Sequence, residues 1–129
     1  MTFRFARHTN NLEQIKYFYT EVMGFELLGG FENHNGYDGI FVGKSHENWH
    51  LEFTQSEDKV IHSFDADDLL VFYPNSKLEF EYLLERLTKH NVHFIEAKNP
   101  YWNDVEVSGG KMFLDPDGFR IVISHLKIK

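Results

Sequence analysis

Side chains able to bind a ligand or a metal ion recur at alternate positions of predicted strands. They are Arg4 and His8 in one strand, His50 and Glu52 in a second, and Asp68 at the start of a third. Because successive strand residues point to opposite faces of a sheet, each pair shares one face. The spacing therefore predicts a polar surface that combines carboxylate, imidazole and guanidinium groups.

The charges on this surface predict an ion-pair set. Two facing carboxylates without a cation repel, and one of them takes up a proton. A guanidinium between them removes this penalty through charge-assisted hydrogen bonds. We therefore expect Arg4 to pair with Glu52 and Asp68, either inside a ligand pocket or as a core ion pair with no ligand role.

The two imidazoles leave a metal site open as an alternative. His8 and His50 with Glu52 would form the two-histidine, one-carboxylate set favoured by non-haem iron. Arg4 argues against this site, because its positive charge repels a second cation. The run His46-Glu-Asn-Trp-His50 also matches the zinc-protease pattern, but that pattern requires a helix, and here it overlaps a predicted strand.

Two amphipathic helices and several strands must position these side chains. The apolar spacing predicts helices over 12–23 and 77–90, with Asn11 and Ser76 as N-caps. Alternation and turn signals predict the remaining elements as strands. These strands cover 3–8, 25–31, 39–42, 49–54, 69–73, 92–97, 111–114 and 119–126. The order is strand, helix and three strands, repeated twice, with one module over about 1–61 and the other over about 62–129.

Composition bounds the class of protein. The 129 residues are 42% hydrophobic and 26% charged, which fits a single globular domain over 1–129. The chain has no cysteine, so thiol chemistry and thiolate metal sites are excluded. A net charge of −7 argues against nucleic acid as a partner. No apolar run has the length of a signal peptide or a membrane span, so we expect a cytoplasmic protein without membrane contact.

Three motifs carry a resemblance to a known family. They are Phe18-Tyr-Thr-Glu-Val-Met-Gly-Phe25, Trp49-His-Leu-Glu-Phe53 and Phe113-Leu-Asp-Pro-Asp-Gly-Phe-Arg-Ile121. In this order and spacing the chain resembles the vicinal oxygen chelate superfamily, the glyoxalase/bleomycin-resistance/dioxygenase group. The resemblance implies an α+β fold in which two βαβββ modules form an open, incomplete barrel around a central cavity.

The resemblance also implies four inward metal-ligand positions. They fall on Arg4, Glu52, Asp68 (or Asp67) and Val122. Arginine has no lone pair for a cation and valine has no donor atom, whereas most catalytic sites need three protein ligands. We therefore expect no metal ion and no other cofactor, with the Arg4 guanidinium in place of the metal charge.

These observations predict a metal-free small-molecule binding protein of the bleomycin-resistance type, which we expect to form a homodimer. The predicted ligand-binding residues are Arg4, His8, His50, Asp68, Tyr101, Trp102 and Arg120. One alternative is a glyoxalase-like lyase, isomerase or dioxygenase with a rearranged metal site or with Glu52 as acid/base catalyst. Another is an interaction domain with a filled cavity. Whether the protein is an enzyme stays open at this point.

Overall fold

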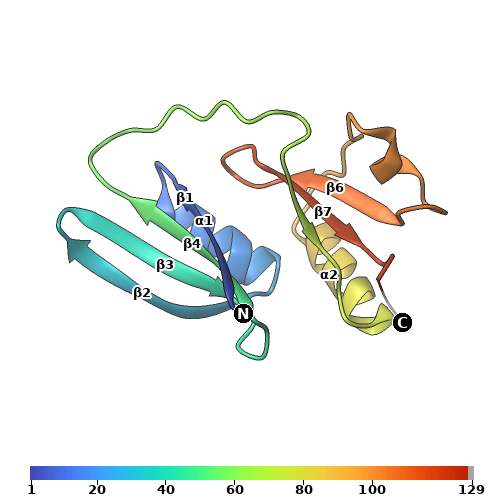
Figure 1. The fold of residues 1–129 in the computed structure, drawn as a ribbon, viewed down its shortest axis with the longest axis horizontal. Coiled ribbons are helices and arrows are strands. Elements are labelled where there is room, and N and C mark those ends of the chain that lie inside the picture. Colours follow the sequence, from blue (N-terminus) through green and yellow to red (C-terminus); the bar gives the residue numbers. More distant parts are fainter. Residues whose placement is uncertain (128–129) are drawn as a thin grey trace. The chain divides into compact units, whose positions relative to one another are not determined.

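The structure, a computed structural model, describes residues 1–127, which form two compact units (Figure 1). The first unit ends at His62 and the second begins at Ser63. Each unit combines a small sheet with an α-helix, so the predicted α+β class with two related modules is confirmed. Within residues 1–127 the strands form two open sheets and no closed barrel.

The first unit follows the predicted order of strand, helix and three strands. It contains β1 (Phe3–His8), α1 (Leu12–Tyr17), β2 (Glu26–His34), β3 (Tyr37–Gly43) and β4 (Trp49–Gln55). The sheet has the order β1-β4-β3-β2. β1 runs parallel to β4, and the other neighbours are antiparallel. This crossover places β1 and β4 side by side, although more than forty residues separate them in the sequence.

The first predicted helix differs from expectation after its second turn. Asn11 caps it as predicted, since its side chain accepts a hydrogen bond from Gln14 N at 3.0 Å. The α-helix ends at Tyr17, however, and Phe18–Val22 form a π-helical turn, η1. The Thr20 hydroxyl donates to the Lys16 carbonyl at 2.7 Å and so competes for an α-helical acceptor.

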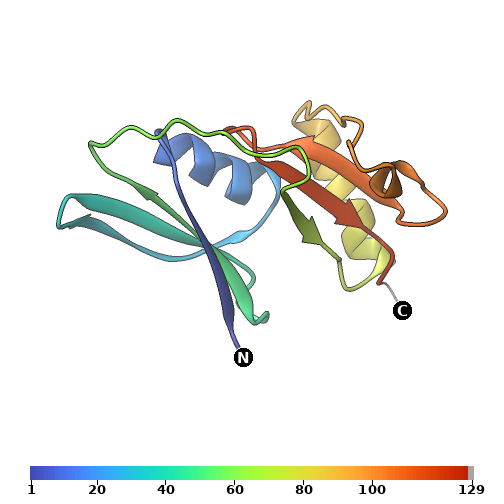
Figure 2. The ribbon, with the colours of Figure 1, turned by 45° about the horizontal axis from the view of Figure 1, so that its top comes forward.

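The helical segment covers one face of the first sheet (Figure 2). Aromatic side chains pack in the core between them. The Tyr19 and Phe53 rings stack with centroids 4.8 Å apart, and both side chains are fully buried. Val42 and Leu51 are buried on the same side of β3 and β4. The residues that alternate with them point to the opposite face.

The second unit has fewer strands than expected. It contains β5 (Leu69–Phe72), α2 (Lys77–Lys89), the 3₁₀ turn η2 (Pro100–Asn103), β6 (Gly110–Leu114) and β7 (Arg120–Ser124). The sheet order is β5-β7-β6, with β5 parallel to β7. The strand predicted over 92–97 is reduced to one bridge between Ile95 and Met112. The Asn103 side chain binds both the N–H and the carbonyl of Ala97, at 2.7 and 2.9 Å, in place of a strand partner.

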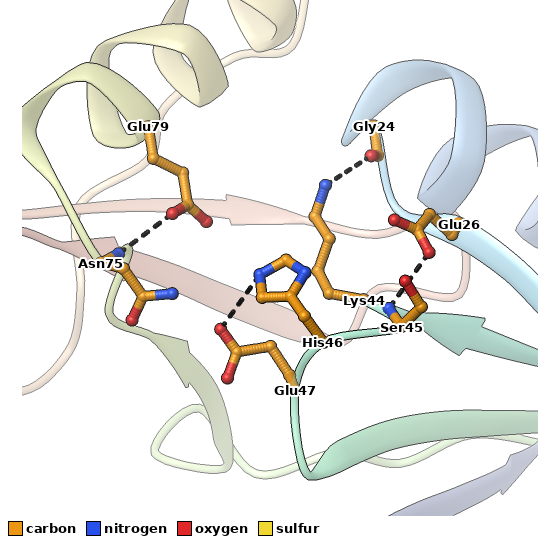
Figure 3. Close-up of polar contacts among 8 residues, drawn as sticks. All are labelled: Gly24, Glu26, Lys44, Ser45, His46, Glu47, Asn75 and Glu79. Atoms are coloured by element: carbon orange, nitrogen blue, oxygen red, sulfur yellow. Dashed lines mark hydrogen bonds and ion pairs between the residues drawn. The ribbon is translucent and has the colours of Figure 1, made fainter.

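Helix α2 begins at the predicted cap. Ser76 Oγ accepts from Glu79 N at 3.1 Å. Glu79 Oε2 accepts from Asn75 N at 3.1 Å (Figure 3). The Glu79 carboxylate thus binds the residue before the cap rather than the N–H of Ser76, so the contacts form a variant of the predicted capping box. Neither α1 nor α2 is long and apolar enough to cross a membrane, and the same holds for every helix in residues 1–127.

Hydrogen bonds hold the segment after β4 against the first unit. Asn10 binds Val60 twice, donating from Nδ2 to the carbonyl at 2.8 Å and accepting from the N–H at 2.9 Å. His62 Nε2 lies 2.8 Å from the His8 carbonyl, which only accepts, so the imidazole donates. The chain up to His62 therefore belongs to the first unit. In the second unit, the Phe64 ring packs edge-on against Phe119, with centroids 4.8 Å apart.

Candidate functional site

The polar side chains predicted on the first module share the sheet face opposite the aromatic core. Cα pairing sets Arg4 against His50 and Ala6 against Glu52 across the parallel strands. Phe41 of β3 lies opposite Glu52 from the other side. We call this surface the open face. It is formed by Arg4, Ala6, His8, Phe31, Gly39, Phe41, His50, Glu52 and Thr54.

Arg4 joins the two polar residues of β4. Its Nε lies 2.8 Å from His50 Nε2, and its Nη1 lies 3.4 Å from Glu52 Oε1. The guanidinium only donates hydrogen bonds, so His50 Nε2 must accept and the imidazole must be neutral. The Arg4 side chain is 48% exposed and that of Glu52 16%. The ion pair is therefore at the surface of this unit, and we assign it little stabilising energy of its own.

Aromatic rings form one border of this polar group. The Arg4 guanidinium carbon lies 4.7 Å from the centroid of the Phe41 ring, a cation–π distance. The His50 ring meets Phe41 edge-on at 5.8 Å, and Phe31 lies 6.1 Å from Phe41 between centroids. A side chain at Gly39 would collide with the Phe31 ring. Glycine at this position therefore lets Phe31 lie flat over β3.

His8 occupies the far end of the open face and contacts other groups. Its Nδ1 lies 2.9 Å from Thr54 Oγ1, and its Nε2 lies 3.3 Å from both Ser56 Oγ and the Asp58 carbonyl. The structure thus places His8 in a separate cluster of hydroxyl and carbonyl groups. Its role as a ligand contact stays a prediction.

In the second module, the two expected ligand positions, Asp68 and Val122, do not lie on the same face of the sheet. The structure pairs Leu69 with Arg120 and Val71 with Val122. Leu69 and Val71 pack against Val122, which is fully buried together with Met112 and Ala97. Leu69 and Val71 therefore share the face of Val122, and alternation assigns Asp68 to the other face, so the expected match of Asp68 with Val122 is wrong; the alternative, Asp67, stays a prediction.

The reason lies in the composition of β5. Every residue of this strand is apolar, so alternation alone cannot show which set faces Val122. The position that corresponds to Arg4 in the second sheet is Leu69. In the first sheet, Ala6 pairs with Glu52, and Arg4 lies two residues before Ala6. In the second sheet, Val71 pairs with Val122, and Leu69 lies two residues before Val71. The Asp68 carboxylate accepts from the Asp65 N–H at 3.3 Å, and a contact between Asp68 and Arg4 stays a prediction.

The remaining predicted contacts also lie in the second unit. Tyr101 and Trp102 form η2, and their rings meet edge-on with centroids 4.9 Å apart. Trp102 packs against the Val122 cluster, whereas Tyr101 is 39% exposed. Arg120 is half-buried on β7, opposite Leu69 and Leu114. Ligand binding by these three residues stays a prediction.

The zinc-protease pattern is split between a loop and a strand. His46 lies in the turn before β4, and its Nε2 faces Glu47 Oε1 at 3.6 Å (Figure 3). His50 is on β4 and binds Arg4 instead. Within residues 1–127, no group of three His, Asp or Glu side chains is arranged to hold a metal ion.

The same turn contains a polar network that the sequence did not suggest. Glu26 Oε2 accepts from Ser45 N at 3.0 Å, and Lys44 Nζ donates to the Gly24 carbonyl at 2.9 Å (Figure 3). The side-chain and backbone hydrogen bonds of Ser45, with the charges of Lys44 and His46, hold the pKa of Glu26 below its ordinary value against the effect of burial. This network fixes the turn that leads into β4.

Comparison with known proteins places the chain in a family. The YycE-like N-terminal domain matches residues 3–54, and the YycE-like C-terminal domain matches residues 67–125. Protein YycE of Bacillus subtilis (strain 168) is 40% identical over 128 residues, which cover 96% of this chain and 87% of that protein. The chain belongs to the YycE-like family.

Solved structures agree with this assignment. The crystal structure of Bacillus subtilis YycE has a TM-score of 0.84 and 38% identity, and the match covers 98% of this chain and 90% of that one. The trypanothione-dependent glyoxalase I of Leishmania major has a TM-score of 0.71 at 20% identity, covering 96% and 85%. The antibiotic binding protein TnmS3 of a Streptomyces species has a TM-score of 0.66 at 21% identity, covering 96% and 93%. The last two share the fold. The YycE crystal structure, which is assigned to the glyoxalase/fosfomycin resistance proteins, confirms the predicted place of this YycE-like chain in the vicinal oxygen chelate superfamily.

The residues of this YycE-like chain do not fit the divalent metal ion of metal-dependent members. Arg4 stands at the first ligand position and binds both candidate donors of the first sheet, His50 and Glu52. A cation between these donors would face a guanidinium at hydrogen-bond distance. In the second sheet, the matching positions are Leu69 and Val122, which have no donor atoms and pack in an apolar cluster. The donor set is therefore unsuited to a metal ion.

Sequence reasoning missed Phe41 as a member of this site. Its position between Gly39 and Gly43 on alternate residues of β3 was the available signal, because small neighbours leave a ring room to lie along a strand. Pairing of β3 with β4 then sets it opposite Glu52.

Proposed function

We propose that the protein binds a small molecule without a metal ion, with Arg4 replacing the metal charge. The observation that carries this proposal is the position of the Arg4 guanidinium, bonded to His50 and Glu52 where metal-dependent relatives hold a cation. Binding rather than catalysis is favoured because the one acid at this position already has a cationic partner. The chain also shares its fold with an antibiotic binding protein, which supports small-molecule binding as the function.

The surroundings of Arg4 are suited to a ligand. The guanidinium is about half exposed, and its planar group stacks on Phe41. This cation–π contact restrains the guanidinium, and a planar guanidinium and an aromatic ring are both surfaces on which a flat molecule can stack. The predicted contacts of a ligand with Asp68, Tyr101, Trp102 and Arg120 belong to this proposal as well.

Metal analysis of the purified protein tests the proposal directly. We expect no nickel, zinc, manganese or iron at one ion per chain, and we expect no change in melting temperature after dialysis against a chelator. A ligand that binds only the folded state raises the melting temperature by mass action. Compounds from a panel of small metabolites and antibiotics should therefore stabilise the chelator-treated protein.

Each alternative gives a different result. Stoichiometric metal that stabilises the protein would contradict the proposal and favour a rearranged metal enzyme. Turnover of a panel compound that is lost in Glu52→Gln would favour an acid/base enzyme. No shift with any compound would favour an interaction domain.

A further inference from the structure

Arg4 retains hydrogen-bonding capacity after its contacts within the protein are made. A guanidinium carries five N–H groups. The contacts to His50 and Glu52 use Nε and one N–H of Nη1, and within the first unit, residues 1–62, Arg4 makes no further hydrogen bond. Five donors less two leaves three, which include both N–H groups of Nη2. These donors belong to a group that three neighbours already hold in place, since the guanidinium also stacks on Phe41.

The charges around these donors cancel. Arg4 is positive, the Glu52 carboxylate paired with it is negative, and His50 is neutral because its Nε2 accepts from Arg4. An anionic ligand at Arg4 would also meet Glu52, which lies 3.4 Å from Nη1. A cationic ligand at Glu52 would meet Arg4 in the same way. The local arrangement therefore favours a ligand with no net charge that accepts hydrogen bonds.

We propose that the ligand of this site is an uncharged planar molecule with a carbonyl oxygen. The carbonyl accepts from Arg4 Nη2, and the flat body packs against the stack of Arg4 on Phe41. This inference rests on the proposed function and adds the chemical class of the ligand. Planarity follows from the guanidinium–aromatic stack, which offers a flat surface, and the missing charge follows from the Arg4–Glu52 balance.

Three matched probes test the chemical class. Chromone is planar, neutral and carries a ketone; chromone-2-carboxylate adds one negative charge to it; 4H-chromene replaces the carbonyl by a methylene group and keeps the ring double bond. Binding to the full chain is measured by calorimetry and by titration of the amide NMR spectrum. We expect chromone to bind about tenfold more tightly than the probe without the carbonyl, the ratio given by one hydrogen bond to a charged donor. The carboxylate should also bind about tenfold more weakly than chromone, because its charge is repelled by Glu52.

Two variants separate hydrogen bonding from charge. Arg4→Gln should weaken chromone binding about tenfold, whereas Arg86→Gln, which removes an equal charge on α2, should leave it unchanged. Glu52→Gln leaves the charge of Arg4 uncompensated. It should therefore strengthen binding of chromone-2-carboxylate about tenfold, while chromone changes by less than about threefold. Glu57→Gln, an exposed acid of the same unit, is the matched control.

The outcomes that overturn this inference are distinct from those that overturn the proposed function. Tighter or equal binding of the carboxylate to the wild-type protein would exclude an uncharged ligand. Chromone binding that is unaffected by Arg4→Gln, or absent while the protein is folded by NMR, would exclude the carbonyl contact. Metal content and the thermal-shift panel decide the proposed function independently of these three probes.

Discussion

Arg4 Nε donates to His50 Nε2 across the parallel pair β1 and β4, with 2.8 Å between the two nitrogens. Because arginine neither accepts hydrogen bonds nor loses its proton in proteins, this one distance fixes the charge and the tautomer of His50. Because His50 Nε2 accepts from Arg4, this nitrogen is not available as a ligand for a cation. The Arg4–His50 contact also keeps the His50 side chain uncharged.

The tautomer of His50 can be measured. We expect a long-range ¹H–¹⁵N spectrum at neutral pH to show His50 with a protonated Nδ1 and an unprotonated Nε2. In Arg4→Gln the preference should weaken, because the glutamine side chain is shorter and uncharged. A protonated Nε2 in the wild-type protein would show that the Arg4–His50 hydrogen bond is not formed.

Two adjacent glycines of β2 should respond differently to substitution. A Cβ at Gly30 would lie 2.7 Å from the Gly39 carbonyl oxygen, which is backbone, whereas a Cβ at Gly29 would make an ordinary 3.5 Å contact with the Phe41 ring. We expect Gly30→Ala to lower the free energy of unfolding by about 1–3 kcal/mol. Gly29→Ala, the matched control, should change it by less than about 1 kcal/mol. Denaturant titration checks both, and equal effects would argue against the β2–β3 register.

Acid should weaken the turn before β4 through Glu26. The lowered pKa of this carboxyl means that its contribution to stability is complete above the ordinary value of 4.5 and is lost as the pH falls through the lowered, folded-state value. Glu26→Gln should therefore reduce the loss of melting temperature between neutral pH and about pH 3. Glu57→Gln is the control, and an identical acid profile for wild type and Glu26→Gln would contradict the Ser45 hydrogen bonds.

The apolar cluster of the second sheet should be a main source of stability for that unit. Met112 is 3% exposed in this cluster, while Leu114 on the same strand is 41% exposed. Met112→Ala should cost about 2–5 kcal/mol of unfolding free energy. Leu114→Ala should cost less than about 1 kcal/mol, since surface changes are small. Chemical denaturation checks both variants. Equal midpoints for Met112→Ala and Leu114→Ala would contradict the burial of Met112 in this cluster.

Association of two copies remains a prediction that mass measurement decides. β2 is an edge strand with Leu27 and Leu28 exposed at 49% and 40%, and such edges are commonly covered by a partner. Light scattering during size-exclusion chromatography should give twice the 15.3 kDa chain mass. Leu28→Lys should shift the mass toward the single chain if this edge is the interface. A single-chain mass at all concentrations would rule out the dimer.

Most of the fold was predictable because the local signals were strong. β1 has its predicted bounds, and Asn11 and Ser76 cap the two helices as expected. The bridge at Ile95 and the π turn from Phe18 were not predictable, because each depends on a competing hydrogen bond, from Asn103 in one case and Thr20 in the other.

The site was predictable where the strands alternate in polarity. Arg4 and Glu52 each stand between apolar neighbours, so their shared face could be read from the sequence. On β5 both faces are apolar, and only pairing with β7 shows that Leu69 rather than Asp68 lies on the side of Val122. Phe41 needed the β3 register as well, since no local pattern connects it to Glu52.

The contacts on either side of Ser63 bear on how the two units are connected. His62 is bonded to the β1 backbone, and the Phe64 ring packs on Phe119 of the second unit. Each unit therefore anchors its own end of the connecting segment, and Ser63 lies between the two anchored residues.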